Sequence, residues 1–92
     1  YERLAGSFTQ RKLEPLYITL PPHFEEQTYT HEGEEWYYVL NGEVTFTIEE
    51  TTYKVKEGEV MHFPSRIRHT WKNETAQPAQ LLCVAIPVIF KA

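Results

Sequence analysis

Apolar and polar side chains alternate along almost the whole chain, in short runs that Gly, Pro or Asn cut off. An amphipathic helix needs apolar residues every three or four positions over ten or more residues, and no stretch of the sequence keeps that period. Alternation with a period of two is typical of a strand that buries one face. The sequence therefore predicts an all-β fold, a sandwich or barrel of about eight short antiparallel strands.

The length and charge of the chain limit what it can bind. Its 92 residues suffice for one domain with one modest core. Nine Lys and Arg, single or in pairs, stand against thirteen Glu, and the net charge is −4. A domain that grips DNA or an anionic membrane needs a basic stripe, so this chain alone is predicted to bind neither. No run of eighteen apolar residues is present, and the single cysteine, Cys83, permits no internal disulfide, so we expect a cytoplasmic protein with an inert, buried thiol.

The dipeptide Asn41-Gly42 stands between two alternating segments, residues 35–40 and 43–48. Asn-Gly is the strongest local signal of a two-residue hairpin, because both residues tolerate the positive φ that a type I′ turn needs. That turn predicts direct pairing of the two segments, with the facing pairs Leu40/Glu43, Val39/Val44, Tyr37/Phe46 and Glu35/Ile48. The apolar side of the hairpin must face the core, and the carboxylate of Glu35 is therefore predicted to point inward as well.

The later strands continue this inner face. A second turn is expected near residues 49–51, and it places Tyr53 and Val55 of the following strand on the inner side. His62 alternates with two apolar neighbours and is predicted to face outward. In the strand after Pro64, Thr70 and Lys72 alternate outward, so the inward side chains are predicted to be His69, Trp71 and Asn73.

Burying the charge of Glu35 among apolar side chains is costly unless a cation or hydrogen bonds compensate it. Two inward histidines are available: His31, four residues earlier, and His69. Two imidazoles and one carboxylate form the ligand set of facial-triad sites for divalent transition metals. An extended strand would separate the Cα atoms of the first two ligands by about 13 Å, so the chain must bend at Gly33. The alternative is a metal-free cluster in which Glu35 is hydrogen-bonded to the imidazoles and to the hydroxyl of Tyr37 or Tyr53.

The motifs resemble those of a known superfamily. The pattern His31-x-Gly33-x-Glu35, followed by Gly42 and then by Gly58-x5-Pro64-x4-His69-x3-Asn73, is similar to the two motifs of the cupins. The resemblance implies a small antiparallel double-stranded β-helix, or jelly-roll barrel, over residues 1–92, with its core motifs at about 27–75. It also implies a ligand site inside the barrel. If that site holds a metal, the resemblance implies one Fe, Mn, Zn or Ni ion on His31, Glu35 and His69.

A narrower resemblance concerns regulators of transcription. Residues 11–16, 21–22, 31–40 and 77–87 resemble parts of the C-terminal sensor domains of helix-turn-helix regulators of the xenobiotic-response-element class. This resemblance implies a bacterial regulator in which the cupin domain senses a small-molecule effector, and in which only another domain contacts DNA. The chain begins with Tyr1 rather than Met, so we expect it to be the C-terminal part of such a longer protein.

The barrel interior is the predicted ligand site. The expected lining is mostly aromatic and polar: Tyr37, Phe46, Tyr53, Arg66, Trp71 and Asn73, with Tyr29 as a further wall. Arg66 lies in the loop before His69, from which it can clamp a carboxylate or phosphate of a ligand; the alternative is a solvated surface charge. An inward tryptophan such as Trp71 can also be an ordinary core residue.

The strand predicted over residues 81–86 is apolar on both faces, as is part of the segment 36–40. Something outside the barrel interior must therefore cover one of these faces. A homodimer that buries the strand in an isologous contact is one answer. The alternative is a pad that Leu4, Phe8 and Leu13 of the same chain lay over it.

These patterns leave three functions open. The first is an effector sensor that performs no reaction. The second is a small metal-dependent enzyme, such as a dioxygenase, epoxidase or isomerase, in which the metal activates oxygen, water or a chelating substrate. The third is a barrel that only dimerises. Catalysis needs an acid or base beside the metal, and the register supplies no further inward Asp, Glu, Lys or Cys, so sensing is favoured and no catalytic residue is predicted.

Overall fold

The computed structural model describes residues 1–26 and 30–87, and within these ranges it contains strands and no helix. The all-β prediction is therefore confirmed. No described segment forms a helix long and apolar enough to cross a membrane. In chain order the strands are β1 (Glu2–Arg3), β2 (Glu14–Leu20), β3 (Glu25–Glu26), β4 (Glu34–Asn41), β5 (Glu43–Ile48), β6 (Thr51–Lys56), β7 (Val60–Pro64), β8 (His69–Lys72) and β9 (Ala79–Ile86).

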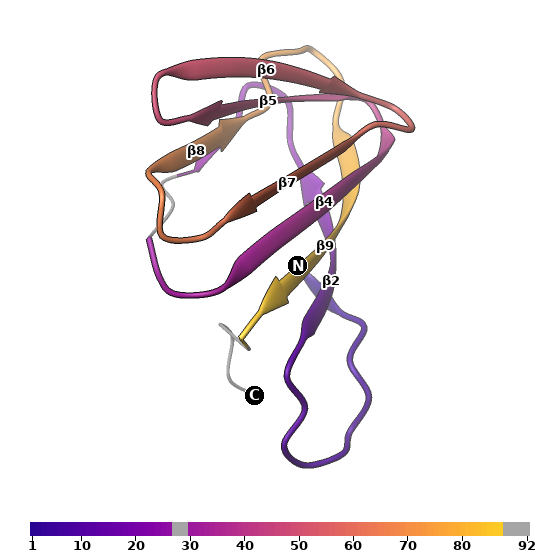
Figure 1. The fold of residues 1–92 in the computed structure, drawn as a ribbon. Coiled ribbons are helices and arrows are strands. Elements are labelled where there is room, and N and C mark those ends of the chain that lie inside the picture. Colours follow the sequence, from indigo (N-terminus) through magenta and orange to yellow (C-terminus); the bar gives the residue numbers. More distant parts are fainter. Residues whose placement is uncertain (27–29, 88–92) are drawn as a thin grey trace.

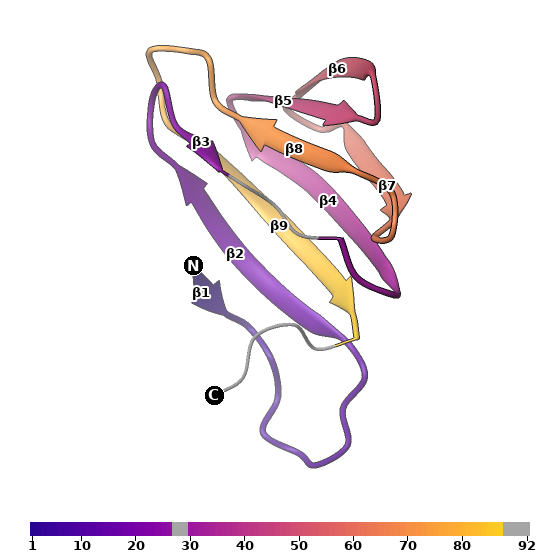
Figure 2. The ribbon, with the colours of Figure 1, turned by 90° about the vertical axis from the view of Figure 1, so that its left-hand side faces the viewer.

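The strands form two antiparallel sheets that face each other across a common core (Figure 1). The first sheet has the strand order β1-β2-β9-β4-β7, and the second has the order β3-β8-β5-β6. Figure 2 shows the second sheet from the side on which β3 and β8 lie, with β2 and β9 of the first sheet beside them. The loop of residues 4–13, between β1 and β2, extends away from the barrel in both views.

The core follows from the period-two alternation of the strands. Alternate residues of β2, β4 and β9 are buried, and their neighbours are half-buried or exposed. Both sheets direct their apolar sides into the same interior, where the buried hydrophobic residues form one cluster. Its members are Leu16, Ile18, Leu20, Tyr37, Val39, Val44, Phe46, Val55, Phe63, Trp71, Ala79, Leu81, Cys83 and Ala85.

The predicted hairpin at Asn41-Gly42 is wrong. β4 pairs with β7 and β9, whereas β5 pairs with β6 and β8, so the two segments lie in different sheets. The physical reason is the backbone at the turn: of the two residues only Gly42 has a positive φ, 89°, and a type I′ turn needs both. Gly42 packs against Ala79, and the chain turns a corner between the sheets. The inward side chains were nevertheless predicted correctly, because both sheets face one interior.

The second turn lies where it was predicted. Ile48 pairs with Thr51, so Glu49 and Glu50 form the turn, and Glu49 adopts a φ of 54°. Val55 is buried as expected. Tyr53 pairs with Phe46 in the register, yet its side chain is 44% exposed. Tyr53 therefore lies on the same side of the second sheet as Phe46 and Val55, as predicted, but β6 is the edge strand of that sheet and leaves the Tyr53 side chain exposed.

The N-terminal segment does not cover the barrel. Leu4, Phe8 and Leu13 all remain exposed, so the alternative of a pad from the same chain is wrong. Their loop is fastened through Glu14, whose fully buried carboxylate accepts hydrogen bonds from Arg3 at 3.0 Å and Arg11 at 2.9 Å. Burial opposes ionisation of Glu14, but the two guanidinium groups outweigh it and hold the pKa of the carboxyl below its usual value.

Candidate ligand site

The side chains of His31, Glu35 and His69 meet at the inner side of the first sheet. Nε2 of His31 lies 3.3 Å from Oε2 of Glu35, and Nε2 of His69 lies 3.2 Å from the same oxygen. The Glu35 and His69 side chains are buried, whereas the side chain of His31 is 26% exposed. The cluster predicted from the sequence therefore forms, and His31 is the member through which it meets solvent.

Gly33 brings His31 onto Glu35. Its φ is 118°, and a Cβ at this position would lie 1.6 Å from the carbonyl oxygen of Ile86. No other residue fits this turn. The bend is held from the opposite side by Ser65, whose backbone N–H donates to the Gly33 carbonyl and whose carbonyl accepts from the His31 N–H. The predicted bend at Gly33 is confirmed.

Both imidazoles are oriented by backbone carbonyls. Nδ1 of His31 lies 2.9 Å from the carbonyl oxygen of Glu32, and Nδ1 of His69 lies 2.8 Å from that of Ile67. A carbonyl can only accept, so each Nδ1 carries the hydrogen and each Nε2 is turned toward Glu35. In the neutral tautomer this Nε2 is an acceptor, and it can donate to the carboxylate only when the ring is protonated.

The electrostatics of the buried pair favour its charged form. Burial lowers the pKa of His69, but the hydrogen bond to Glu35 and the Ile67 carbonyl outweigh it, and the net shift is upward. Burial likewise raises the pKa of Glu35, but hydrogen bonds from His69 and Tyr37 outweigh it, and the net shift is downward. The two shifts therefore favour the ionised form of Glu35 and the protonated form of His69 relative to the same groups in water.

Tyr37 completes the surroundings of the carboxylate. Its hydroxyl donates a hydrogen bond to Oε1 of Glu35, as predicted for Tyr37 or Tyr53, whereas Tyr53 is exposed. Burial, the Cys83 thiol and the Glu35 carboxylate raise the pKa of Tyr37 well above its usual value. Tyr37 is therefore a neutral donor.

Two residues of this site were not predicted. Phe63 stacks on the ring of Tyr37 at 6.0 Å and lies 4.6 Å from the ring of His69. Ser65 is fully buried, and its Oγ makes no hydrogen bond of normal geometry, although it lies close enough to Glu35 to lower the pKa of that carboxyl. The position of Phe63 follows from alternation along β7, but the position after Pro64 gave no signal for Ser65.

Cys83 contradicts the expectation that no cysteine points into the barrel. It is buried, as predicted, but it points into the barrel and pairs with Tyr37 in the register, so an inward cysteine does exist. Burial raises the pKa of its thiol to about 12. The thiol stays protonated at neutral pH and is a poor nucleophile, as an inert thiol should be.

The six predicted lining residues fall into three groups. Tyr37, Phe46 and Trp71 pack on one another, with ring centroids 5.1–5.9 Å apart, directly behind Glu35. Tyr53 and Arg66 are exposed. Asn73 is buried away from the cluster, where its amide donates to the carbonyls of Leu20 and Gln77 and organises the loop before β9. Tyr29 lies outside the described residues.

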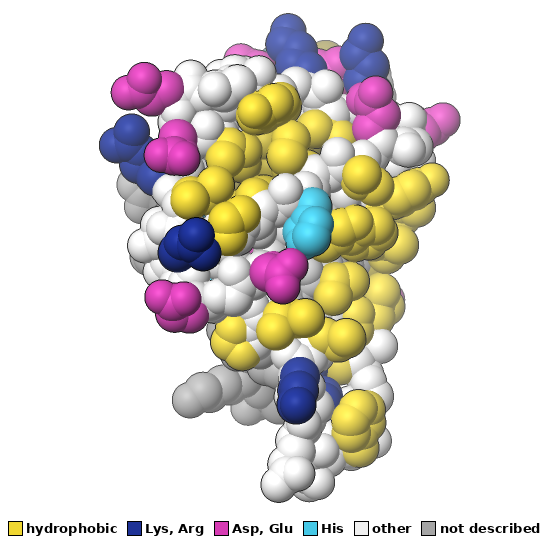
Figure 3. Space-filling view, viewed as in Figure 1, with side chains coloured by type: hydrophobic (Ala, Val, Ile, Leu, Met, Phe, Trp, Pro, Cys, Tyr) yellow, Lys and Arg dark blue, Asp and Glu magenta, His cyan; other side chains and the backbone are white. Residues whose placement is uncertain are grey.

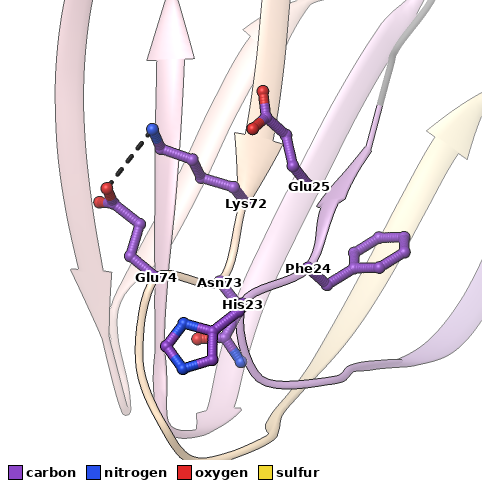
Figure 4. Close-up of a pocket in the computed structure, with 6 residues that line it drawn as sticks. All are labelled: His23, Phe24, Glu25, Lys72, Asn73 and Glu74. Atoms are coloured by element: carbon purple, nitrogen blue, oxygen red, sulfur yellow. Dashed lines mark ion pairs between the residues drawn. The ribbon is translucent and has the colours of Figure 1, made fainter.

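A separate depression opens at the far end of β8 from His69 (Figure 4). It has a volume of about 290 Å³, and an ion pair of 3.4 Å between Lys72 and Glu74 crosses one side of it. Its lining is mostly polar and consists of His23, Phe24, Glu25, Lys72, Asn73 and Glu74. Of the predicted ligand residues it includes only Asn73, so it is not the site predicted from the sequence.

The three predicted metal ligands are His31, Glu35 and His69. Among the described residues, no group of three or more His, Cys, Asp or Glu side chains is arranged to hold a metal ion. The donor types nevertheless fit: donors bonded to one metal at about 2.1 Å lie within about 4.2 Å of each other, and both imidazole-to-carboxylate distances meet this limit. Metal-bound histidines also commonly donate their other N–H to a carbonyl, as both do here. Metal binding stays a prediction.

The two facing sheets and the His-Glu-His cluster on their inner side define a cupin-type barrel. The sequence profile of the cupin domain family matches residues 16–85, and this chain belongs to that family. A curated relative, the uncharacterized protein MJ1618 of Methanocaldococcus jannaschii, is 31% identical over 55 residues, which are 60% of this chain and 44% of the relative. The chain thus matches less than half of that relative's length.

Solved structures show the same fold. The cupin domain of an XRE family transcriptional regulator from Enterobacter cloacae superposes with a TM-score of 0.85 at 18% identity, over 95% of this chain and 94% of that one. An HTH_3 family transcriptional regulator from Vibrio cholerae gives a TM-score of 0.81 at 23% identity, over 94% and 49%. The protein TT1209 from Thermus thermophilus gives 0.78 at 27% identity, over 94% and 84%. The chain is thus a cupin domain similar in fold to those of XRE family regulators.

Proposed function

We propose that this cupin domain is the effector-sensing part of a cytoplasmic transcriptional regulator, with DNA bound by another domain. The observation that carries the proposal is the cluster of His31, Glu35 and His69, in which two oriented imidazoles converge on one buried carboxylate oxygen. The partial exposure of His31 gives a ligand a point of entry. The fold shared with cupin domains of XRE and HTH_3 regulators supports the regulatory role.

The chemistry of the cluster favours binding over turnover. The groups around Glu35 are a neutral phenol with a raised pKa, a protonated thiol with a pKa of about 12, and imidazoles already held by carbonyls. Such groups hold a polar ligand by hydrogen bonds and charge, but they offer no strong base of their own. A small molecule with a hydrogen-bonding head group suits this site. The packed rings of Tyr37, Phe46 and Trp71 form the apolar wall behind the carboxylate.

A thermal-shift screen against small carboxylates, phosphates, sugars and divalent metal ions tests this proposal. A compound at about 100 times its Kd should stabilise the wild type by about 2.7 kcal/mol, and the shift should disappear in Glu35→Gln. Glu34→Gln is the matched control, because Glu34 adjoins Glu35 on β4 but points outward and is exposed. The proposal fails if every stabilising compound acts equally on Glu35→Gln.

A metal-dependent activity is the second candidate, and the donor types favour it. His31, Glu35 and His69 would hold the ion, and a bound Fe, Mn, Zn or Ni would supply Lewis-acid or redox chemistry. Plasma mass spectrometry on tag-free protein tests this candidate against the double variant His31→Ala/His69→Ala. One metal per chain that the double variant loses supports it; a metal-free wild type, even after incubation with each ion, removes it.

A further inference from the structure

Glu26 lies on the edge strand β3 of the second sheet and faces the interior of the barrel. In the register it is opposite Trp71, and Trp71 is opposite Phe46, so the three side chains share the inner side of that sheet. The indole Nε1–H of Trp71 donates to Oε2 of Glu26 at 2.9 Å. An indole has only this one donor. The bond to Glu26 therefore fixes the orientation of a ring that is only 5% exposed.

The other carboxylate oxygen of Glu26 links the two sheets. The hydroxyl of Tyr1, the residue before β1, donates to Oε1 of Glu26 at 2.8 Å. β1 is the edge strand of the first sheet, and β3 is the edge strand of the second. The hydrogen bond between Tyr1 and Glu26 therefore connects these two edges, and it ties the N-terminal strand to the interior of the barrel.

Glu26 acts here as an acceptor for neutral groups. It is half-buried, and none of the ion pairs found in the described part of the chain includes it. Its two donors are a phenol and an indole. Hydrogen bonds to an ionised carboxylate are roughly twice as strong as those between two neutral groups. Glu26 can therefore hold two separate elements, β8 and the residue before β1, in one arrangement.

Two aromatic rings connect Glu26 with the carboxylate of Glu35. The ring of Trp71 packs on that of Tyr37, with the two centroids 5.1 Å apart, and the hydroxyl of Tyr37 donates to Oε1 of Glu35. The residues Glu35, Tyr37 and Trp71 are each at most 6% exposed. A ring in such a close-packed core cannot move unless its neighbour moves with it. A continuous set of contacts therefore runs from the ligand site to the N-terminal strand.

We propose that Glu26 is a positioning residue of the ligand site and that it couples the state of this site to β1. The inference rests on the proposed function, because it takes Glu35 as the carboxylate that binds the ligand. A ligand that draws the hydroxyl of Tyr37 away from Glu35 shifts Tyr37 against Trp71. The indole then changes its bond to Glu26, and the change reaches Tyr1 and β1. For a sensor, the N-terminal strand is thus a segment that responds to the ligand.

Backbone amide NMR of the ligand-free protein tests this coupling. Tyr37→Phe removes the hydroxyl that bonds to the buried carboxylate, and it should move the amide resonances of β1, residues 2 and 3. The movement should be lost when Tyr37→Phe is combined with Glu26→Met, which keeps the length of the side chain and removes both carboxylate oxygens. Combination with Tyr1→Phe, which removes only the hydroxyl that Glu26 accepts, should abolish the movement as well.

Glu25→Met is the matched control, because Glu25 adjoins Glu26 on β3 but is exposed. Combined with Tyr37→Phe, it should leave the movement of the β1 resonances intact. The two tryptophans provide a second readout. Glu26→Met should move the indole N–H resonance of Trp71, which loses its acceptor, and leave that of Trp36 in place. Trp36 lies on the outer face of the first sheet, where Figure 3 shows apolar side chains gathered over β4 and β7.

Three results would overturn the proposal. The β1 resonances could stay in place in Tyr37→Phe alone, move equally whether Glu26 or its Met variant is present, or cease to move in the Glu25→Met control. Circular dichroism confirms that each variant is folded, and Tyr1→Phe keeps the test decisive if Glu26→Met does not fold. Because no ligand is added in this experiment, failure of the coupling and failure of the sensing proposal are distinguishable.

Discussion

At the scale of single residues, the central feature of the barrel is the buried carboxylate of Glu35, whose pKa is lowered despite its burial. The imidazole of His69, at 3.2 Å, and the hydroxyl of Tyr37 lower the pKa of this carboxyl, and His31 lies 3.3 Å from the same oxygen as His69. Each imidazole is held by a backbone carbonyl, so its orientation does not depend on a ligand. Such preorganisation lowers the ordering cost of binding and is what a recognition site needs.

Ser65 is the one described residue with a buried side-chain group that lacks a hydrogen bond of normal geometry. We expect Ser65→Ala to raise the free energy of unfolding by about 1 kcal/mol, because an unsatisfied buried hydroxyl costs stability and alanine fills nearly the same space. Urea unfolding at neutral pH measures this. A comparable loss of stability would show instead that the hydroxyl already bonds to Glu35 in the folded protein.

Glu14 is expected to make stability depend on acid pH. Its pKa is lowered in the folded state, so its contribution is complete above the unfolded pKa of about 4.3 and is lost as the pH falls through the folded pKa. Glu14→Gln should cost about 2 kcal/mol at neutral pH. The gap between wild type and Glu14→Gln in urea unfolding should narrow below about pH 4, and a gap that stays constant down to pH 2 would contradict this.

At the scale of elements, the turn at Gly33 decides whether the site forms. Gly33→Ala should cost at least about 3 kcal/mol, because its Cβ would meet the Ile86 carbonyl and its φ is positive. Gly58→Ala is the control: it has a φ of 83° but open space around a Cβ, so it should cost only about 1 kcal/mol. Chemical unfolding compares them, and equal costs would show that strain at positive φ dominates over the clash.

The same scale separates what the sequence could predict from what it could not. Alternation identified the inward residues Glu35, Phe46, His69 and Trp71, because the period of two is local. Strand partners are not local: the corner at Gly42 looks like a hairpin in the sequence, yet it connects two sheets. The exposure of Tyr53 was also hidden, since only the sheet order shows that β6 is an edge strand.

At the scale of the whole molecule, β4 presents different residues to the two sides of the first sheet. β4 directs Glu35 and Tyr37 into the core, and it directs Trp36 and Tyr38 to the outer face of the sheet. A ligand that moves Glu35 or Tyr37 can therefore also move Trp36 and Tyr38, because all four residues belong to β4. For a regulator, that arrangement would link effector binding to the geometry of a dimer.

We expect the effector to tighten or loosen the homodimer that the sequence predicts. Adding a compound found by the thermal-shift screen should change the dimer dissociation constant by about 5-fold or more, the lower end of typical coupling between two sites. Sedimentation equilibrium with and without the compound measures this, with Glu35→Gln as the control. An unchanged dissociation constant at saturating compound would show that the inner and outer faces of β4 are not coupled.

The most direct test of the binding site uses the four histidines of the chain, two inside the cluster and two outside it. Their side-chain ¹⁵N resonances can be followed by NMR during titration with a stabilising compound. The resonances of His31 and His69 should move together, while those of His62, on the outer face, and His23, beside the depression near Lys72, should not. Movement of His23 or His62 alone would place the ligand elsewhere and contradict the site at Glu35.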